Sequence, residues 1–138
     1  MSFSFNTKVR FGDCDPAGIV FYPRYFEMLN AALEDWFADG LGCDFEELHR
    51  AMRTGTPTVR LDSKFLAPSQ LNDQLTVTID LLKLSERSCD ILYTISFGDQ
   101  VRMTAEATLV CMDLDRRRAK HWPSQIFERM AQGLPQAA

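Results

Sequence analysis

The sequence is poor in the residues from which proteins build metal sites and disulfide frameworks. It has two histidines and four cysteines, and no two cysteines form a CxxC pair. The cysteines are Cys14, Cys43, Cys89 and Cys111. This spacing disfavours a zinc site. It leaves disulfides open, but a chain in which 46% of residues are hydrophobic does not need them. We therefore expect a reduced, cytoplasmic protein with no metal and no other cofactor.

Long apolar runs and an excess of positive charge are also missing. No segment approaches the roughly 18 consecutive apolar residues that a membrane span requires. The N-terminal stretch MSFSFNTKVRFG lacks the apolar run of a secretory signal. The formal net charge of -4 disfavours nonspecific nucleic-acid binding, which depends on lysine and arginine neutralising phosphates. Neither a membrane nor a nucleic acid is therefore an expected partner.

The chain does have enough apolar sequence for one folded core. Its 138 residues suit one domain and are too few for two comfortable ones. No linker, internal repeat or low-complexity segment divides the chain. We therefore expect a single domain over residues 1–138.

The first third of the chain predicts one strand and one long helix. Residues 3–11 alternate as a strand does, and the turn-rich GDCDPAG ends them. Pro23 suits the first turn of a helix, where its missing N–H has no cost. Apolar residues then recur every three or four positions, as on one buried helix face; they are Phe26, Leu29, Leu33, Trp36 and Phe37. Two glycines then stop the helix, and Asp44 is expected to cap a short second helix that ends near Met52.

The rest of the chain is predicted to be mostly strands. Four segments rich in Val, Thr, Ile and Leu are separated by short turns; they are residues 56–66, 74–84, 89–97 and 101–113. The FGDQV turn is a tight hairpin signal. The basic segment after residue 113 is expected to extend the last strand, and Pro123 to open a C-terminal helix. Because strands with hairpin-length connections pair antiparallel, this order indicates an α+β fold in which a curved antiparallel sheet wraps around one long central helix.

One segment of the chain carries a specific resemblance. Residues 11–37, FGDCDPAGIVFYPRYFEMLNAALEDWF, place an aspartate, two residues, a glycine and then apolar and aromatic residues before the central helix. The segment resembles the signature of the hotdog-fold acyl-CoA thioesterases, and it is especially similar to the 4-hydroxybenzoyl-CoA thioesterase branch. GTPTVRLDSKFLAPSQLNDQLTV also resembles that branch, and the likeness covers nearly the whole chain. The resemblance implies a hotdog fold and hydrolysis of an aryl- or medium-sized acyl-CoA thioester to free acid and CoA.

The resemblance assigns the chemistry to the loop before the helix. A carboxylate there, Asp15, can act as a general base on water or as a nucleophile that forms a mixed anhydride. A helix N-terminus offers unpaired N–H groups and partial positive charge, and the resemblance implies that the backbone amide of Tyr22 polarises the thioester carbonyl. Gly18 lets the chain pass close to the ligand. The local sequence alone favours an ordinary Asp-Pro turn, and it is the resemblance over the whole chain that favours a catalytic Asp15. Asp13 is expected to be structural.

Three further residues are candidates for contacts with the acyl group. Asn30 is predicted to lie on the helix face that Leu33 and Phe37 approach, where it either bonds a substrate substituent or satisfies a neighbouring backbone group. In the family branch an aspartate at this position meets the substrate hydroxyl, so the amide puts specificity for a para-hydroxyl group in doubt. Thr56 and Thr58 are candidate pocket residues.

The phosphates of CoA require basic residues at the mouth of the site. Lys83 and Arg87 flank a hairpin turn, where the resemblance places the phosphate contacts, although KLSERS is less basic than the family's run. The most basic segment is RRRAK, residues 116–120. It is expected either to contribute from a neighbouring subunit or to be a solvated hairpin tip.

Two other functions remain alternatives at this point. Acyl-thioester dehydratases share the fold but use a histidine with a carboxylate, and neither His49 nor His121 lies in the motif. A non-catalytic acyl-CoA-binding module stays open, because fold alone does not imply function. Exposed sheet edges predict a homodimer or homotetramer, and the resemblance implies a site at the dimer interface.

Overall fold

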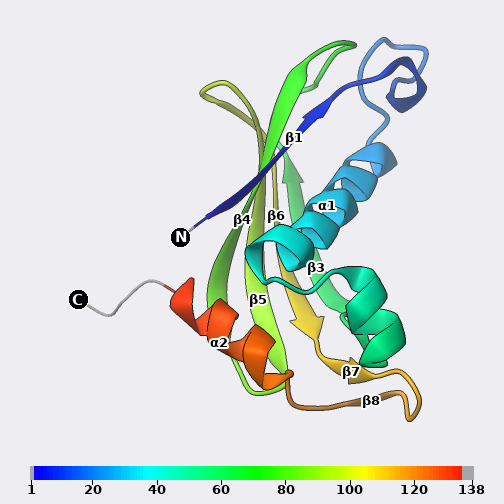
Figure 1. Cartoon of the computed structure of the whole chain (residues 1–138). Coiled ribbons are helices and arrows are strands. Elements are labelled where there is room, and N and C mark those ends of the chain that lie inside the picture. Colours follow the sequence, from blue (N-terminus) through cyan, green and yellow to red (C-terminus); the bar gives the residue numbers. More distant parts are fainter. Residues whose placement is uncertain (1, 135–138) are drawn as a thin grey trace.

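The fold is built on a five-stranded antiparallel sheet and one helix that crosses it (Figure 1). The structure is a computed structural model, and it describes residues 2–134. In spatial order the strands are β1 (Phe3–Lys8), β4 (Gln74–Leu84), β5 (Ser88–Phe97), β6 (Gln100–Val110) and β3 (Thr58–Phe65). The first and last of these are edge strands. The predicted antiparallel sheet is confirmed.

Helix α1 (Pro23–Asp35) begins at the proline that the sequence analysis singled out. It continues as a π-helical turn, Trp36–Gly40. One face of α1 is buried, and it consists of Tyr25, Met28, Leu29, Ala32 and Leu33. Burying such side chains stabilises the fold by about 1.5–3 kcal/mol for each large one.

The central strands present one apolar face to α1. In β4, β5 and β6 every second residue is buried, as expected for a sheet with one covered face. The buried residues of β6 include Ala105 and Ala107, which have small side chains. The register shifts between Leu81 and Lys83 and between Ile95 and Ser96. Such irregularities add bend and twist, which lets the sheet curve around the helix.

The segment predicted as one strand over residues 101–113 is divided, and this prediction is wrong in detail. Strand β6 ends at Val110, and β7 (Met112–Asp113) belongs to a second sheet with β2 (Thr54–Gly55) and β8 (Arg118–Ala119). The basic segment therefore turns back on β7 instead of extending it. The cause is local, because the carboxylate of Asp113 accepts the N–H groups of Asp115 (2.9 Å) and Arg116 (3.2 Å).

The remaining elements are short. The first strand ends at Lys8, before the predicted residue 11, because Phe11–Asp13 forms a 3₁₀ turn. The predicted second helix is one π-helical turn, Glu47–Ala51, although Asp44 does cap it by accepting the Glu47 N–H at 2.8 Å. Helix α2 (Ser124–Gln132) follows Pro123 as predicted. Within residues 2–134, no helix combines the length and the apolar character that crossing a membrane requires.

Candidate active site

The loop between β1 and α1 holds Asp15 in a tight backbone frame. The Asp15 N–H donates to the Ile19 carbonyl at 2.9 Å, and the Gly18 N–H donates to the Asp15 carbonyl at 2.9 Å. Gly18 has a φ of 82°, a conformation that favours glycine, which is a local reason for glycine at this position. Asp15 Oδ1 accepts the Ala17 N–H at 2.9 Å, and Oδ2 has no hydrogen-bond partner among the described residues. One carboxylate oxygen thus fixes the rotamer and the other is available.

Backbone pairing ties this loop to the segment before β4. The Val20 N–H donates to the Ser69 carbonyl at 2.9 Å, and Ile19 forms a β-bridge with Gln70. Asp13 works at the other side of the loop: its Oδ2 accepts the Arg10 N–H at 2.9 Å, and its carbonyl accepts the Phe21 N–H at 2.8 Å. Asp13 therefore organises the loop, which agrees with the structural part expected for it.

The first turn of α1 leaves one amide free. The N–H groups of Arg24 and Tyr25 bond back to the carbonyls of Phe21 (2.8 Å) and Tyr22 (3.1 Å), and Pro23 has no N–H. The N–H of Tyr22, the N-cap residue, donates to no residue in the described part of the chain. It has the partial positive charge of a helix N-terminus behind it, so it is a ready donor for a carbonyl oxygen.

Two hollows flank the loop. The first is lined by Phe11, Cys14, Asp15, Pro16, Gly18 and Leu71. The second is lined by Ile19, Val20, Tyr22, Tyr25, Phe65, Leu66, Ala67 and Pro68. The loop thus has the carboxylate on one side and an apolar, aromatic recess at the helix start on the other.

Phe65, at the end of β3, is a candidate site residue that the sequence analysis did not select. Its ring lies 5.9 Å from that of Tyr22, 6.0 Å from that of Tyr25 and 6.2 Å from that of Phe26, between ring centroids. The Phe65 side chain is nevertheless 48% exposed. Nearby, the Tyr25 hydroxyl is buried without a hydrogen-bond partner among the described residues. The aromatic cluster offers flat apolar surfaces to a ring-shaped ligand.

The candidate residues for the acyl group and for CoA lie in two places, and a single chain does not bring them together. Asp15, Gly18 and Tyr22 lie at the end of the sheet where β4 begins, because their loop pairs with residues 69 and 70. Lys83 lies near the other end of β4, and Arg87 follows that end. Nine residue steps of about 3.3 Å separate Gln74 from Lys83, which is on the order of 30 Å.

The two threonines share the end of the sheet that carries Arg87. Thr58 is paired with Leu109, and the Cys111 N–H donates to the Arg87 carbonyl at 2.8 Å. Thr56 comes two residues before Thr58, between β2 and β3. Figure 1 shows the two ends plainly, with the loop before α1 at one end of the sheet and β7 and β8 at the other.

Comparisons with known proteins decide the family. The family model of the Thioesterase-like superfamily matches residues 9–130, nearly the whole chain. The chain belongs to this superfamily. A 1,4-dihydroxy-2-naphthoyl-CoA hydrolase of Acaryochloris marina is 30% identical over 125 residues, which cover 88% of this chain and 90% of the relative. The 4-hydroxybenzoyl-CoA thioesterase of a Pseudomonas species is 28% identical over 135 residues, covering 92% of this chain and 96% of the relative.

The solved structures agree with this assignment. A mutant 4-hydroxybenzoyl CoA thioesterase complexed with 4-hydroxybenzoyl CoA matches with a TM-score of 0.83 and 28% identity, over 94% of this chain and 98% of that chain. The fold is the hotdog fold, and the expected resemblance is confirmed.

Asn30 is exposed on α1, whereas Leu33 and Phe37 are buried. Because Leu33 follows Asn30 by three residues, the two positions share a side of the helix, and Asn30 lies at the exposed border of the face that Leu33 buries. Asn30 follows Phe26 by four residues, and Phe26 contacts Phe65 of β3. Residues four apart lie on the same side of a helix, so Asn30 lies on the side of α1 that runs toward the β3 edge.

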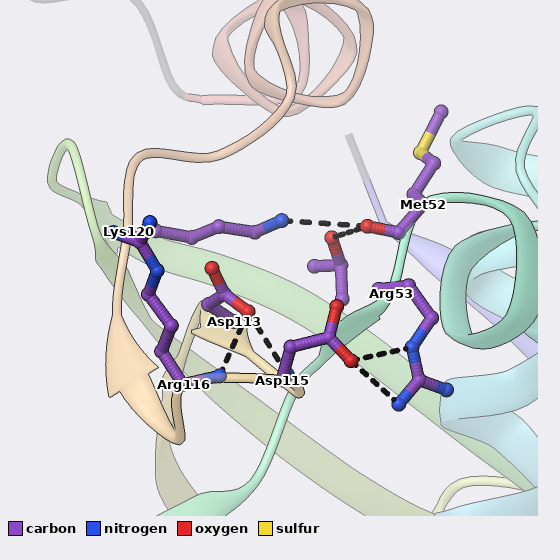
Figure 2. A network of polar contacts seen from close by, with 7 residues as sticks. Met52, Arg53, Asp113, Asp115, Arg116 and Lys120 are labelled. Atoms are coloured by element: carbon purple, nitrogen blue, oxygen red, sulfur yellow. Dashed lines mark hydrogen bonds and ion pairs between the residues drawn. The ribbon is translucent and has the colours of Figure 1, made fainter.

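The most basic segment forms an ordered hairpin at the Arg87 end (Figure 2). Asp115 Oδ1 accepts a hydrogen bond from Arg53 Nε (3.0 Å) and forms an ion pair with Arg53 Nη2 (2.9 Å). Lys120 Nζ donates to the Met52 carbonyl at 3.5 Å. Backbone N–H donors, first that of Arg116, lower the pKa of the Asp113 carboxyl.

Within the described chain, the guanidinium groups of this hairpin have no bonded acidic partner; they belong to Arg116, Arg117 and Arg118. The Lys120 N–H bonds to the Cys111 carbonyl at 2.9 Å, and the Cys111 N–H bonds to the carbonyl of Arg87. Arg87 and the basic segment 116–120, the two candidates for the CoA phosphates, therefore lie beside each other.

Proposed function

We propose that the protein is a cytoplasmic homodimeric thioesterase that hydrolyses aryl-CoA thioesters to the free acid and CoA. The observation that carries the proposal is the pairing of a carboxylate with a free oxygen, on Asp15, and a free helix N-terminal amide, on Tyr22, within one short loop. The relatives named above act on naphthoyl and hydroxybenzoyl thioesters of CoA. The exposed aromatic surface of Phe65 suits the same class of acyl group.

The Tyr22 amide supplies electrostatic stabilisation. The thioester carbonyl oxygen accepts the Tyr22 N–H, and the bond strengthens as negative charge develops on that oxygen in the tetrahedral intermediate. Removing one such donor from an enzyme costs about 10²–10³ in kcat. Because this donor is a backbone group, side-chain substitution does not remove it, and it depends on α1 starting at Pro23.

Asp15 supplies the base or the nucleophile. As a base, its free oxygen takes a proton from water while the water oxygen attacks the carbonyl carbon; the C–S bond then breaks and the thiolate of CoA takes up the proton. As a nucleophile, the same oxygen attacks the carbon, CoA leaves, and water hydrolyses the resulting anhydride. Both routes use the atoms that the loop presents.

The edge strand β3 supports the dimer. Seven of its eight residues are exposed, and three of them are large apolar side chains: Val59 (61%), Leu61 (45%) and Phe65 (48%). An apolar strand with free edge groups is an aggregation hazard unless another chain pairs with it. Pairing with a second β3 about a two-fold axis is antiparallel and self-complementary. It brings the Thr58 end of the partner next to the Phe65 end of the first chain.

This pairing gives a shared site. Asp15 and Tyr22 of one chain then face the end of the sheet that carries Arg87 of the partner subunit. Asn30 faces the same junction, because it lies on the β3 side of α1. We therefore place the acyl group against the aromatic cluster and the CoA phosphates against the basic end of the partner. The four free cysteines fit the reducing compartment.

The test is thiol release from a panel of benzoyl, hydroxybenzoyl, phenylacetyl and aliphatic CoA esters. Asp15→Asn should lower kcat by about 10²–10⁴ while binding persists, because the amide keeps the shape and loses the base or nucleophile. Asp13→Asn is the matched control and should cost far less in rate. Binding without thiol release from any ester would indicate a non-catalytic acyl-CoA-binding module.

A further inference from the structure

Arg102 is a buried cation that the proposed chemistry does not use. It lies on β6, two residues after the start of that strand, and it is 8% exposed. Its Nη1 donates to the Pro68 carbonyl (2.8 Å), to Ser69 Oγ (3.0 Å) and to Asp73 Oδ2 (3.1 Å). Its Nε donates to Gln100 Oε1 at 2.7 Å. A charged group so far out of water is tolerated only with several such partners.

All three acceptors of Nη1 lie on the segment that holds the Asp15 loop. The Ser69 side chain binds Arg102, and its carbonyl accepts the Val20 N–H at 2.9 Å. Asp73 Oδ2, which binds Arg102, also accepts the Gln70 N–H at 2.9 Å, and Gln70 bridges Ile19.

The chain of bonds ends at the backbone of Asp15, the residue that carries the reactive carboxylate. Ile19 in turn accepts the Asp15 N–H at 2.9 Å. Ser69 itself is fully buried, and the side chain of Asp73 is 20% exposed, so these bonds are shielded from competing water. Only Ser69 by one route, and Asp73 and Gln70 by the other, thus separate the guanidinium from the loop that carries Asp15.

Further contacts fix the backbone and the guanidinium of Arg102. The Arg102 carbonyl accepts the N–H groups of Leu66 (2.8 Å) and Ala67 (3.2 Å), which start the same segment. The Phe97 ring lies 4.8 Å from the guanidinium carbon. A planar group with five donors can satisfy this arrangement, whereas a lysine ammonium has three donors and no planar face to stack.

We propose that Arg102 is a positioning residue that holds Asp15 at the thioester through the segment 66–73. The proposal rests on the proposed function, and it assigns to Arg102 no contact with substrate. A small displacement of a catalytic group by a distant change can cost about 100-fold in rate. Loss of Arg102 should therefore lower kcat much more than it raises KM.

The experiment compares Arg102→Met, which keeps the length and removes every donor, with Arg102→Lys. We expect kcat to fall about tenfold to 100-fold in Arg102→Met and less in Arg102→Lys, with KM changed by no more than a few-fold. Ile126→Ala is the control, because Ile126 is fully buried in α2 and lies outside the segment. The loss of Tm in Ile126→Ala is compared with that in Arg102→Met, and both variants are assayed well below their Tm. Under these conditions Ile126→Ala should keep the wild-type kcat.

The decisive readout is the double variant with Asp15→Asn. If Arg102 acts through Asp15, Arg102→Met should not lower the residual kcat of Asp15→Asn any further, because the effects of residues acting as one unit are not additive. An additive loss, or a kcat within twofold of wild type in Arg102→Met alone, would overturn the proposal. Full activity of Asp15→Asn would instead overturn the proposed function.

A second variant keeps the test usable if Arg102→Met does not fold. Ser69→Ala removes one bond to Arg102 and keeps the carbonyl that accepts the Val20 N–H. It should lower kcat by a few-fold, and again not in the Asp15→Asn background. An unchanged kcat in folded Ser69→Ala together with a full-rate Arg102→Lys would overturn the proposal.

Discussion

A heterodimer of two defective chains tests where the two halves of the site meet. One chain carries Asp15→Asn and the other carries Arg87→Ala. Within a chain the two positions lie at opposite ends of β4, on the order of 30 Å apart. If the active site combines Asp15 of one chain with Arg87 of the partner subunit, the mixed dimer contains one site with both residues intact. Its second site lacks both.

The expected magnitudes separate the alternatives clearly. The Asp15→Asn homodimer should lose about 10²–10⁴ in kcat. The Arg87→Ala homodimer should lose about tenfold in kcat/KM at low salt, the scale of one charge-assisted phosphate contact. With one intact site of two, the heterodimer should show about half the wild-type kcat/KM. If both residues act within one chain, one site lacks the base, the other lacks the phosphate contact, and the heterodimer reaches only about a twentieth.

The assay uses co-expression with two different affinity tags and purification over both, so that only mixed dimers remain. Thiol release from benzoyl-CoA is then measured at a substrate concentration far below KM, where the rate reports kcat/KM. Doubly tagged wild type is the reference. The control is a doubly tagged dimer in which one chain carries both substitutions and the other carries none. This control keeps one complete site only if the two residues act within one chain. Activity near a twentieth for the mixed dimer would refute the shared site.

Other consequences of the structure can be measured separately. Arg87→Ala should raise KM with little change in kcat, and the effect should shrink as salt screens the phosphates; an unchanged KM at low salt would remove Arg87 from the site. Phe65→Ala should raise KM for aryl esters more than for acetyl-CoA, and equal changes would show that its ring does not contact the acyl group. Asn30→Asp should shift kcat/KM toward the 4-hydroxybenzoyl ester, since a carboxylate forms a charge-assisted bond to a phenol; no shift would show that Asn30 does not read the ring. Burial raises the pKa of the Cys89 thiol from its ordinary value near 9 to about 12. As the pH rises, the Cys89 thiol therefore ionises in the unfolded chain before it ionises in the folded one. The free energy of unfolding, measured by urea unfolding, should fall between pH 9 and 12 by up to about 1.4 kcal/mol per pH unit. The fall should be smaller in Cys89→Ala.

The sequence predicted the parts of the fold that depend on local patterns. Pro23 marked the helix start because it fits the first turn, and the alternating burial of β4, β5 and β6 followed from their period of two. The division at Cys111 was missed because residues 109–112 are all apolar and contain no turn residue, and because the bond from the Cys111 N–H to the Arg87 carbonyl is a tertiary contact. The turn after Asp113 did have a local signal, since aspartate often accepts the N–H groups two and three residues later.

The candidate site was predictable only where its residues are neighbours in the chain. Asp15, Gly18 and Tyr22 lie within one loop, so one motif indicates all three. Phe65 is fifty residues from Asp15, and inside a strand it is an ordinary residue; it enters the site because β3 ends beside the start of α1. Arg102 gave no signal either, because one arginine in a strand is usually solvated.

The position of Asn30 and the composition of the hollow at the helix start lead to one view of how the acyl group is selected. The described residues that line this hollow carry no ionisable acid or base except the phenols of Tyr22 and Tyr25. Asn30 is neutral and exposed on the side of α1 that faces the β3 edge. A recess of this kind favours an acyl group by its area and shape, and one added hydroxyl changes the preference by only about 100-fold. The neutral amide of Asn30 therefore allows several aryl esters to bind. For a carboxylate at this position, only a ring that donates a hydrogen bond would offset the free-energy cost of removing the charge from water.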